Sequence, residues 1–214
     1  MLNTQQYLQN LEYLVKQNHL LEIPDENDLQ TLLYISHESG ISVDTLLFKN
    51  MEMQDAIKNS GLKMLVMDCD GVLTDGGMTF TKNGDEIKRF NAKDGQGIKN
   101  AMQAGMKTGI ISAGISTGLV EKRAEMLGIE HCYVGKSPKL EILTEWSEKL
   151  GIELSEMAYI GDDVTDIAIM QNVGASFCPA DAVWKVKLEA DVILSAKGGE
   201  GCVRELVENY LLPH

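Results

Sequence analysis

The chain has 214 residues, of which 44% are hydrophobic, and its formal net charge is -13 at pH 7. This length and composition suffice for one buried globular domain and an additional segment. The negative charge disfavours binding to nucleic acid or anionic lipid, because both need a basic surface. The sequence shows no signal-peptide region, no apolar stretch near the roughly 20 residues that span a bilayer, and no CxxC spacing among its cysteines. We therefore expect a cytoplasmic protein with reduced thiols.

Residues 1–60 differ from the rest of the chain and predict a helical N-terminal extension of two or three short helices. Apolar residues recur there at helical spacing. They are Tyr7, Leu8, Leu11, Leu14, Val15, Leu29, Leu32, Leu33 and Ile35. The stretch LQTLLYISHESGISVDTLL resembles the last helices of a repressor-type helix-turn-helix domain, which makes DNA binding an alternative function. Nine acidic residues against three basic ones in this region disfavour contact with phosphates, so we expect these helices to pack on the core or mediate assembly.

From Lys63 onward, short apolar runs alternate with amphipathic segments, which is the pattern of a parallel sheet. The expected strands are 63–68, 107–112, a short one near Tyr133, 157–160, 175–178 and 191–194. Helices are expected between the strands, on both faces of the sheet. We therefore predict a Rossmann-like open parallel α/β sheet over residues 61–214.

The residues expected to start and end two of the helices support this pattern. Ser116 is expected to cap one helix and Gly128 to end it. Ser137, followed by Pro138, is expected to open another helix, which Gly151 ends. Because both helices begin after a predicted strand, each fits a strand-helix-strand unit.

One segment interrupts the alternation after the first strand. The stretch MTFTKNGDEIKRF predicts a β-hairpin, with Asn83 and Gly84 in the positive φ conformation of a tight two-residue turn. The intervals on either side of the second strand are too short for a separate cap domain. We therefore expect a hairpin flap in place of a cap, and a site that is open to solvent.

Polar residues follow several predicted strands, and the carboxyl ends of parallel strands meet at one edge of a sheet. Asp68 and Asp70 end the first strand, and Ser112 ends the second. Lys139 lies near the start of the helix after the third strand, and Asp162 follows the fourth. Clustered carboxylates repel one another unless a cation sits among them, and oxygen ligands suit Mg²⁺. We predict a magnesium site held by Asp68 and Asp162.

The same residues suit the hydrolysis of a small phosphorylated metabolite. Asp68 could attack phosphorus to form an aspartyl-phosphate, and Asp70 could protonate the leaving alcohol and then activate water. Ser112 and Lys139 could contact the phosphate oxygens, and Asp166 could hold Lys139 in place. A phosphomutase would use the same intermediate. The lack of room for a cap that excludes water favours hydrolysis.

The motifs DCDGVLTD and GDDVTD, with Ser112 ending an apolar strand and a downstream lysine, resemble the four motifs of the haloacid dehalogenase superfamily of phosphatases. The stretches GDEIKRFNAKDGQGI and GGEGCVRE are further similar to its 3-deoxy-D-manno-octulosonate 8-phosphate phosphatase subfamily. The resemblance covers residues 63–212. It depends on the motifs occurring in this order, since an isolated DxD is common after strands.

This resemblance implies that Asp68 is the nucleophile and that Asp70 is the acid/base, whose backbone carbonyl also binds the metal. It implies that Asp162 is the third protein ligand of Mg²⁺ and that Asp163 sits beside the metal, as a ligand or next to one. It also implies a homotetramer in which hairpins form a central barrel and a neighbour's glycine-rich tail covers the site. Arg204 in that tail would then approach the substrate or bind back to its own core.

Two positions depart from the pattern that phosphatases of the octulosonate often show. The second motif reads ISAGIS, with Ala113 and Gly114 where Thr-Gly-Arg is frequent, and Glu200 stands where an arginine is common. Two basic residues that could bind a sugar-acid carboxylate are therefore missing. A nonulosonate 9-phosphate or another small sugar phosphate is the alternative substrate. The candidate substrate contacts are Lys93, Gly114, Lys136 and Arg204.

Overall fold

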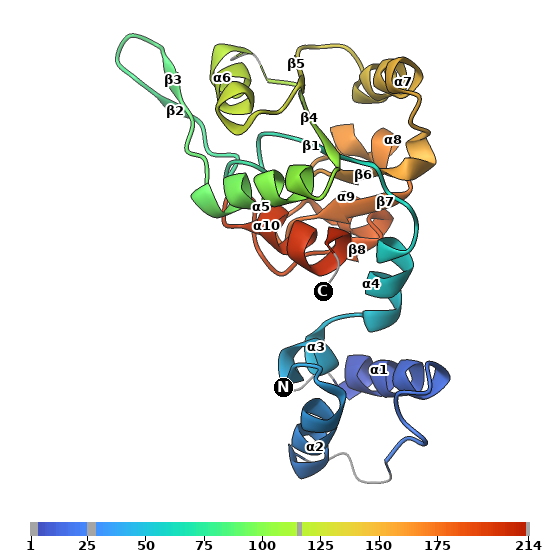
Figure 1. Cartoon of the computed structure of the whole chain (residues 1–214). Helices are drawn as coiled ribbons and strands as arrows, with labels where there is room; N and C mark the ends of the chain where they lie inside the picture. The colour runs from blue at the N-terminus through green and yellow to red at the C-terminus, as the bar shows by residue number, and fades with distance from the viewer. Residues whose placement is uncertain (1–3, 25–28, 115–116, 213–214) are drawn as a thin grey trace. The chain divides into compact units, whose positions relative to one another are not determined.

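The computed structural model describes residues 4–24, 29–114 and 117–212 (Figure 1). The chain divides into two compact units between residues 59 and 60. Among the described residues, no helix is long and apolar enough to cross a membrane. Ser116, the predicted cap of a helix, lies outside the described residues.

In the part that the structure describes, the first unit contains four helices, whereas the sequence predicted two or three. They are α1 (Thr4–Lys16), α2 (Leu29–Ser39), α3 (Val43–Phe48) and α4 (Met51–Lys58). Its small apolar core is formed by Tyr7, Leu11, Leu14, Leu32, Ile35, Leu46 and Leu47. Leu29 and Leu33, which the sequence pattern grouped with Leu32, are exposed instead. The buried face of α2 is therefore narrower than predicted.

The second unit is built on a six-stranded sheet with the strand order β5-β4-β1-β6-β7-β8. The strands are β1 (Met64–Met67), β4 (Lys107–Ser112), β5 (His131–Val134), β6 (Met157–Ile160), β7 (Ala175–Cys178) and β8 (Val192–Ile193). All neighbours pair in parallel. β1, β6 and β7 are buried along their whole length, as expected for a parallel sheet covered on both faces. The predicted α/β fold is confirmed.

Helices cover both faces of this sheet (Figure 1). One face carries α5 (Ala92–Gln103), α6 (Thr117–Leu127) and α10 (Cys202–Leu206). The other carries α7 (Lys139–Leu150), α8 (Ile167–Met170) and α9 (Trp184–Glu189). Short helical turns lie at η1 (Leu154–Glu156) and η2 (Val164–Asp166), and the π-helical turn η3 (Val207–Leu211) follows α10.

The predicted ends of α6 and α7 are confirmed, but the predicted start of α7 is wrong. Gly128 and Gly151 follow these helices with positive φ angles, which glycine adopts without steric cost. Pro138, rather than Ser137, occupies the N-cap position of α7. The extended ψ of 128° at Pro138 keeps that residue outside the helix, so helical conformation begins at Lys139.

The position of β1 decides where a site can form. After β5 the chain crosses back to the other side of β1, so that β1 lies between β4 and β6. Open α/β sheets bind ligands beyond the carboxyl ends of the strands at such a reversal of strand order. The backbone N–H of Asp68 donates to the carbonyl of Ile160 at 2.9 Å, which keeps the ends of β1 and β6 level.

The predicted hairpin lies between β1 and α5 and consists of β2 (Thr79–Phe80) and β3 (Glu86–Ile87). Its turn differs from the prediction, because Gly84 has a positive φ and Asn83 does not. The N–H of Thr81 donates to the carbonyl of Asp85 at 2.8 Å, so three residues form the loop. Glycine takes the single left-handed position of such a loop at no steric cost, and a two-residue turn is not formed.

The glycine-rich segment 197–201 packs against its own chain. The N–H of Gly199 donates to the carbonyl of Val72 at 2.9 Å. A Cβ atom placed on Gly198 would lie 1.9 Å from the carbonyl oxygen of Gly71, so the two backbones are in close contact. Within its own chain the segment supports the loop after β1, and its reach to a neighbouring site stays a prediction.

Candidate active site

The loops after β1, β4 and β6, together with the start of α7, enclose a cavity of about 350 Å³ at the carboxyl edge of the sheet. The residues that line it are Asp68, Asp70, Gly76, Ser112, Ala113, Gly114, Lys139, Asp162, Asp163 and Thr165. Every residue predicted to be catalytic or to bind metal is among them, as is Gly114. The fold therefore brings together four separate stretches of the sequence.

Asp68 and Lys139 form a buried ion pair. Only 6% of the surface of each residue is exposed, and Asp68 Oδ1 lies 2.8 Å from Lys139 Nζ. Burial raises the pKa of Asp68 to about 6, against the opposing charge of Lys139. Burial lowers the pKa of Lys139, but the carboxylates of Asp68 and Asp166 raise it overall. The lysine therefore stays charged beside a carboxylate that is largely ionised at pH 7.

Asp166 anchors this lysine, as predicted. Its Oδ1 accepts hydrogen bonds from Lys139 Nζ and from the Tyr159 hydroxyl, both at 2.6 Å. Its Oδ2 accepts from the backbone N–H groups of Asp162 at 3.0 Å and Asp163 at 3.1 Å. The side chain has no exposed surface. Since four donors occupy its two oxygens, Asp166 has a positioning role and little capacity for a further ligand.

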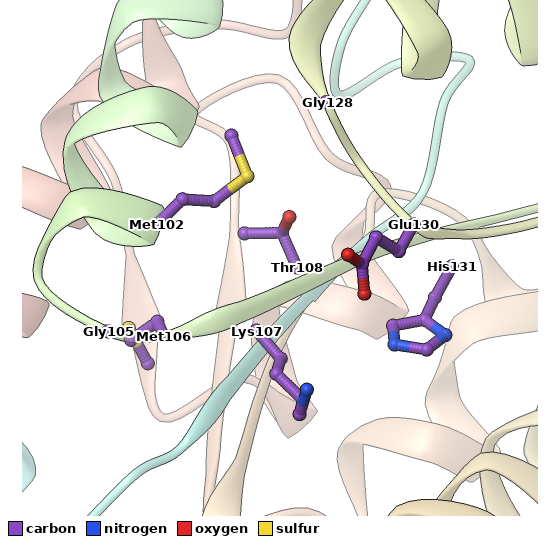
Figure 2. Close-up of a pocket in the computed structure, with 8 residues that line it drawn as sticks. All are labelled: Met102, Gly105, Met106, Lys107, Thr108, Gly128, Glu130 and His131. Carbon is purple, nitrogen blue, oxygen red and sulfur yellow. The ribbon is translucent and has the colours of Figure 1, made fainter.

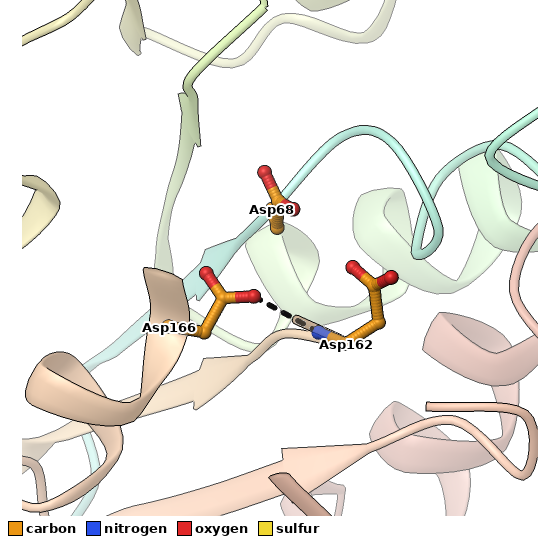
Figure 3. Close-up of side chains that lie close together, drawn as sticks. All are labelled: Asp68, Asp162 and Asp166. Atoms are coloured by element: carbon orange, nitrogen blue, oxygen red, sulfur yellow. Dashed lines mark hydrogen bonds between the residues drawn. The ribbon is translucent and has the colours of Figure 1, made fainter. Parts of the chain in front are cut away.

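Figure 3 shows Asp68, Asp162 and Asp166 gathered where β1 and β6 end, and their carboxylates offer oxygens within 4.8 Å of one another. Asp162 Oδ1 is buried and has no hydrogen-bond partner. Burial, followed by the charges of Asp68 and Asp166, raises the pKa of Asp162 to about 8. The cluster thus holds one buried acceptor that nothing in the described residues satisfies.

Gly71 makes this approach of Asp162 possible. Its φ is +88°, and a Cβ atom at this position would lie 2.1 Å from Asp162 Oδ2. Any side chain here would have to displace the carboxylate. The glycine of the DxDG sequence is therefore required for steric reasons at the centre of the site.

These residues fit a hard divalent cation. Three carboxylates face the single ammonium of Lys139, and an unpaired buried acceptor costs free energy that a bound cation removes. Geometry alone would offer Asp166 as a ligand. Its oxygens already accept four hydrogen bonds, so Asp68 and Asp162 are the better ligands.

Asp163 and Ser112 line the cavity from the loops after β6 and β4. The carboxylate of Asp163 is exposed and accepts the N–H of Val164 at 2.7 Å, so it caps the turn η2. Ser112 is buried, and its Oγ accepts the N–H of Gly114 at 3.2 Å. Because Oγ is used there as an acceptor, its proton is available to a group in the cavity.

One residue of this site was missed by the sequence analysis. Lys88, directly after β3, places Nζ 2.6 Å from Asp70 Oδ1 and 2.9 Å from Glu86 Oε1. A lysine beside a hairpin strand is usually solvated, and no motif links it to Asp70. Its only sequence signal was its place in the stretch GDEIKRF, which was noted for its resemblance to a family.

Three of the predicted substrate contacts lie outside the cavity lining. Lys93 is exposed in the first turn of α5, and Lys136 is exposed between β5 and α7. Arg204, on α10, pairs with Glu208, and its backbone N–H donates to Asp94 at 3.0 Å. Within this chain the Arg204 guanidinium therefore contacts an exposed residue of the following turn, and its approach to a substrate stays a prediction.

A second cavity, of about 520 Å³, adjoins the first and extends toward the hairpin. Asp70, Gly76 and Gly114 line both cavities. The other lining residues of the second cavity are Met78, Phe80, Gly84, Glu86 and Lys88. These three shared residues thus lie between the carboxylates of the first cavity and the partly apolar hairpin of the second.

Figure 2 shows a third cavity, of about 250 Å³, at the amino ends of β4 and β5. Its lining residues are Met102, Gly105, Met106, Lys107, Thr108, Gly128, Glu130 and His131. Burial and the neighbouring charge of Lys107 lower the pKa of His131. The cavity lies at the opposite edge of the sheet from the carboxylate cluster, so it takes no part in that site.

Comparison with known proteins agrees with this fold and site. The family of haloacid dehalogenase-like hydrolases matches residues 95–174. The chain is 41% identical, over 72% of its length and 82% of the relative, to the 3-deoxy-D-manno-octulosonate 8-phosphate phosphatase KdsC of Escherichia coli (strain K12). It is 36% identical, over 74% of its length and 87% of the relative, to the KdsC of Haemophilus influenzae.

Solved structures show the same relationship. A probable YrbI family phosphatase from Pseudomonas syringae matches with a TM-score of 0.71 and 41% identity, over 74% of this chain and 89% of that one. The octulosonate phosphatase of Moraxella catarrhalis, in complex with magnesium ion, phosphate ion and KDO, matches with a TM-score of 0.70 and 36% identity, over 73% and 88%. The chain belongs to the haloacid dehalogenase-like hydrolases, in the family of the 3-deoxy-D-manno-octulosonate 8-phosphate phosphatases.

Proposed function

We propose that the chain is a magnesium-dependent phosphatase that hydrolyses the phosphate ester of a small sugar acid, such as 3-deoxy-D-manno-octulosonate 8-phosphate. The observation that carries this proposal is the group of Asp68, Asp162 and Asp166 around Lys139, in which three carboxyl groups meet one lysine and Oδ1 of Asp162 has no partner among the described residues. The Escherichia coli and Haemophilus influenzae relatives, at 41% and 36% identity, carry the name of this activity. Their names supply the substrate class.

In this proposal Asp68 and Asp70 perform the two chemical steps. Asp68 attacks phosphorus, the bond from phosphorus to the ester oxygen breaks, and Asp70 gives its proton to the departing oxygen. The ionised Asp70 then removes a proton from water, whose oxygen attacks the aspartyl-phosphate. Inorganic phosphate leaves, and Asp68 is restored as a carboxylate.

Lys139 and Ser112 are the groups that face the phosphate oxygens in this reaction. Lys139 is fixed by two carboxylates at 2.6 and 2.8 Å, so little side-chain freedom is lost when phosphate binds. The Ser112 hydroxyl is oriented by the N–H of Gly114 and can donate its proton to an oxygen of the phosphate. Both groups stabilise the negative charge on the phosphate oxygens while the phosphoryl group is transferred.

Mg²⁺ would be held by the carboxylates of Asp68 and Asp162 and by the backbone carbonyl of Asp70, with Asp163 next to it. Bound there, it would neutralise the charge of the phosphate and of the nearby carboxylates. The unpartnered Oδ1 of Asp162 supports this assignment. The Moraxella catarrhalis relative holds a magnesium ion, and a Haemophilus influenzae relative is cobalt-bound.

The test is phosphate release from three substrates: the octulosonate 8-phosphate, a nonulosonate 9-phosphate and a neutral hexose 6-phosphate. We expect hydrolysis with Mg²⁺, loss of activity after EDTA treatment and recovery when Mg²⁺ is restored. Release that persists after exhaustive chelation contradicts the metal requirement. No release from any of the three substrates contradicts the proposed function.

The same assay tests how the substrate carboxylate is recognised. Ala113 and Gly114 offer no guanidinium group, so we expect kcat/KM to favour the acids over the neutral sugar by less than about 100-fold. A site with a built bidentate contact discriminates by roughly 10⁴ or more. Strong exclusive preference for the octulosonate would show that another residue reads the carboxylate.

We also propose a cytoplasmic homotetramer assembled through the hairpins. Met78, Phe80 and Ile87 are exposed on a ribbon with only two paired residues in each strand, and such a ribbon is marginal alone. Closed symmetric assembly covers exposed edges in identical chains. All four cysteines are free, which suits a reducing compartment. Sedimentation that finds an active monomer at assay concentration contradicts the tetramer.

For the N-terminal extension, residues 1–60, we propose a separate helical domain and do not propose DNA binding. α2 and α3 are separated by a short turn that contains Gly40, with a φ of +69°. However, α3 contains neither lysine nor arginine. A helix that binds DNA needs cations for the phosphates, and this one offers none. Because the chain divides into two compact units, a variant of residues 61–214 should keep phosphatase activity.

A further inference from the structure

Lys88 links the hairpin to the acid/base of the proposed reaction. Its Nζ lies between Asp70 Oδ1 at 2.6 Å and Glu86 Oε1 at 2.9 Å. Only 5% of its side chain is exposed, although Lys82 and Arg89 of the same hairpin are exposed. Two carboxylates already neutralise this ammonium. It is therefore poorly suited to be a substrate cation.

The two oxygens of Asp70 have different surroundings. Oδ1 accepts from Lys88 Nζ and, at 3.2 Å, from the hydroxyl of Thr74. Thr74 is itself buried, and its Oγ1 accepts the N–H of Gly76 at 3.2 Å. Two donors from two different segments therefore fix the position of Oδ1.

The other oxygen of Asp70 faces the cavity. A Cβ atom placed on Gly114 would lie 3.4 Å from Asp70 Oδ2 and 3.2 Å from Ser112 Oγ. Gly114 lines both the cavity with the carboxylate cluster and the adjoining cavity under the hairpin. Oδ2 thus lies where the two cavities meet, which is where the bond between phosphate and leaving group would lie.

We propose that Lys88 is a positioning residue that holds Asp70 Oδ1, so that Oδ2 is the oxygen that exchanges protons with the leaving group and with water. This inference rests on the proposed phosphatase function. The terminal torsion of an aspartate is soft, so a carboxylate without a fixed partner samples many orientations. A donor that fixes one oxygen raises the fraction of molecules in the productive orientation, which lowers the entropic part of the barrier.

The position of Lys88 on the hairpin gives this contact a second consequence. Glu86 and Lys88 flank Ile87 at the end of β3, and only two residues of each hairpin strand are paired. A contact that restricts the motion of the hairpin therefore also restricts the side chain of Asp70, because Lys88 links the two. The orientation of the acid/base depends on a segment 18 residues further along the chain.

The experiment compares Lys88→Met and Lys88→Arg with Lys82→Met, a matched control that removes an exposed lysine from the same hairpin. Steady-state phosphate release is measured in the full chain with Mg²⁺. For Lys88→Met we expect kcat to fall by roughly 10- to 100-fold, while KM changes by less than about threefold. Lys88→Arg should restore a large part of kcat. Lys82→Met should match the unsubstituted chain.

Thr74→Val provides an independent variant, since it removes the other donor to Asp70 Oδ1. It should lower kcat by roughly 3- to 10-fold with KM unchanged. If Lys88→Met does not fold, this variant tests whether the position of Asp70 Oδ1 matters for turnover. A kcat equal to the control in either folded variant overturns the proposal. A raised KM with unchanged kcat in Lys88→Met also overturns it, because Lys88 would then bind substrate. An inactive unsubstituted chain would instead refute the proposed function.

Discussion

Lys139 Nζ lies 2.8 Å from Asp68 Oδ1, and both residues are buried at the carboxyl edge of the sheet. Asp68 follows the central strand β1, whereas Lys139 begins the helix after the edge strand β5. Their contact joins the motif after β1 and the start of α7 in one site. Removing the charge of Lys139 leaves Asp68 without its cation, whereas Lys139 keeps Asp166 at 2.6 Å when the charge of Asp68 is removed.

The first prediction concerns the nucleophile. Asp68→Asn keeps the shape of the side chain but removes the charge that attacks phosphorus and binds metal, so turnover should fall by roughly three orders of magnitude or more. Folding should persist because Lys139 keeps its bond to Asp166 at 2.6 Å. The measurements are phosphate release and thermal unfolding of the same preparation. Robust turnover in the folded variant would refute the role of Asp68.

The second prediction concerns the space beside Asp162. Gly71→Ala would place Cβ 2.1 Å from Asp162 Oδ2, whereas a Cβ atom at Gly84 has nothing within 4 Å. The φ angles are nearly the same, +88° and +89°, so both alanine variants carry similar backbone strain, about 1 kcal/mol. Only Gly71→Ala should also displace the carboxylate, with a large loss of kcat and of stabilisation by Mg²⁺.

Gly84→Ala is therefore the matched control, and thermal shift with and without Mg²⁺ is the measurement. Equal activity and equal Mg²⁺ response in the two variants would show that the clash is relieved without moving Asp162. Because the strain is common to both, that outcome does not depend on how much either variant is destabilised.

The third prediction concerns pH. Burial raises the pKa of Asp162 to about 8 and that of Asp68 to about 6, both above the ordinary value of 3.8. Between pH 3.8 and about 8, the folded state therefore binds more protons than the unfolded chain. As pH rises through this range, the free energy of unfolding of the metal-free protein should fall. Urea unfolding in EDTA, at a series of pH values across this range, measures the slope.

Two comparisons make this pH prediction specific. Asp162→Asn should reduce the slope because the group whose pKa is raised to about 8 is gone. Added Mg²⁺ should restore stability most at the alkaline end, where the carboxylates are ionised and bind the ion. A free energy of unfolding that rises with pH across this range in EDTA would contradict the account.

The fourth prediction concerns the C-terminal segment. The sequence alone favoured a tail whose truncation after Ala196 impairs turnover more than folding. In the structure, Cys202, Val203 and Leu206 of α10 are fully buried. Each such apolar side chain contributes on the order of 1.5–3 kcal/mol, so their loss approaches the whole stability of a domain, about 5–15 kcal/mol.

We therefore expect the truncated chain to lose cooperative unfolding, and not only turnover. Circular dichroism during heating measures this directly, and Arg204→Ala serves as the control because its guanidinium pairs only with Glu208 among the ion pairs described. A truncated chain that unfolds cooperatively at the temperature of the full chain would contradict this prediction. It would favour a role of the segment at a neighbouring site.

Prediction from sequence succeeded where local pattern and topology agree. The apolar run before Asp68 predicted a buried strand, and an aspartate directly after such a strand has to lie at the edge of the sheet. Asp162 follows β6 in the same way. Since a parallel sheet aligns the carboxyl ends of its strands, the convergence of these residues follows from connectivity alone.

Prediction was less successful where an element's direction depends on what packs against it. The ion pair of Arg204 with Glu208 is an example, since nothing in the motif around Arg204 indicated it. Lys88 was overlooked because whether a lysine is solvated or paired depends on what lies over it. In the hairpin turn, Asn83 could have taken a left-handed angle, and the three-residue loop used only Gly84.

The sequence by itself determined the class of fold, the family and the set of acidic and basic groups that meet at one edge of the sheet, because these depend on periodicity and strand order. Only the tertiary structure decided which oxygens are satisfied and which are not. Asp166 became an anchor with four donors, and Asp162 kept a buried oxygen without one. The physical reason is that hydrogen bonds depend on distances of a few tenths of an ångström, which packing sets and residue order does not.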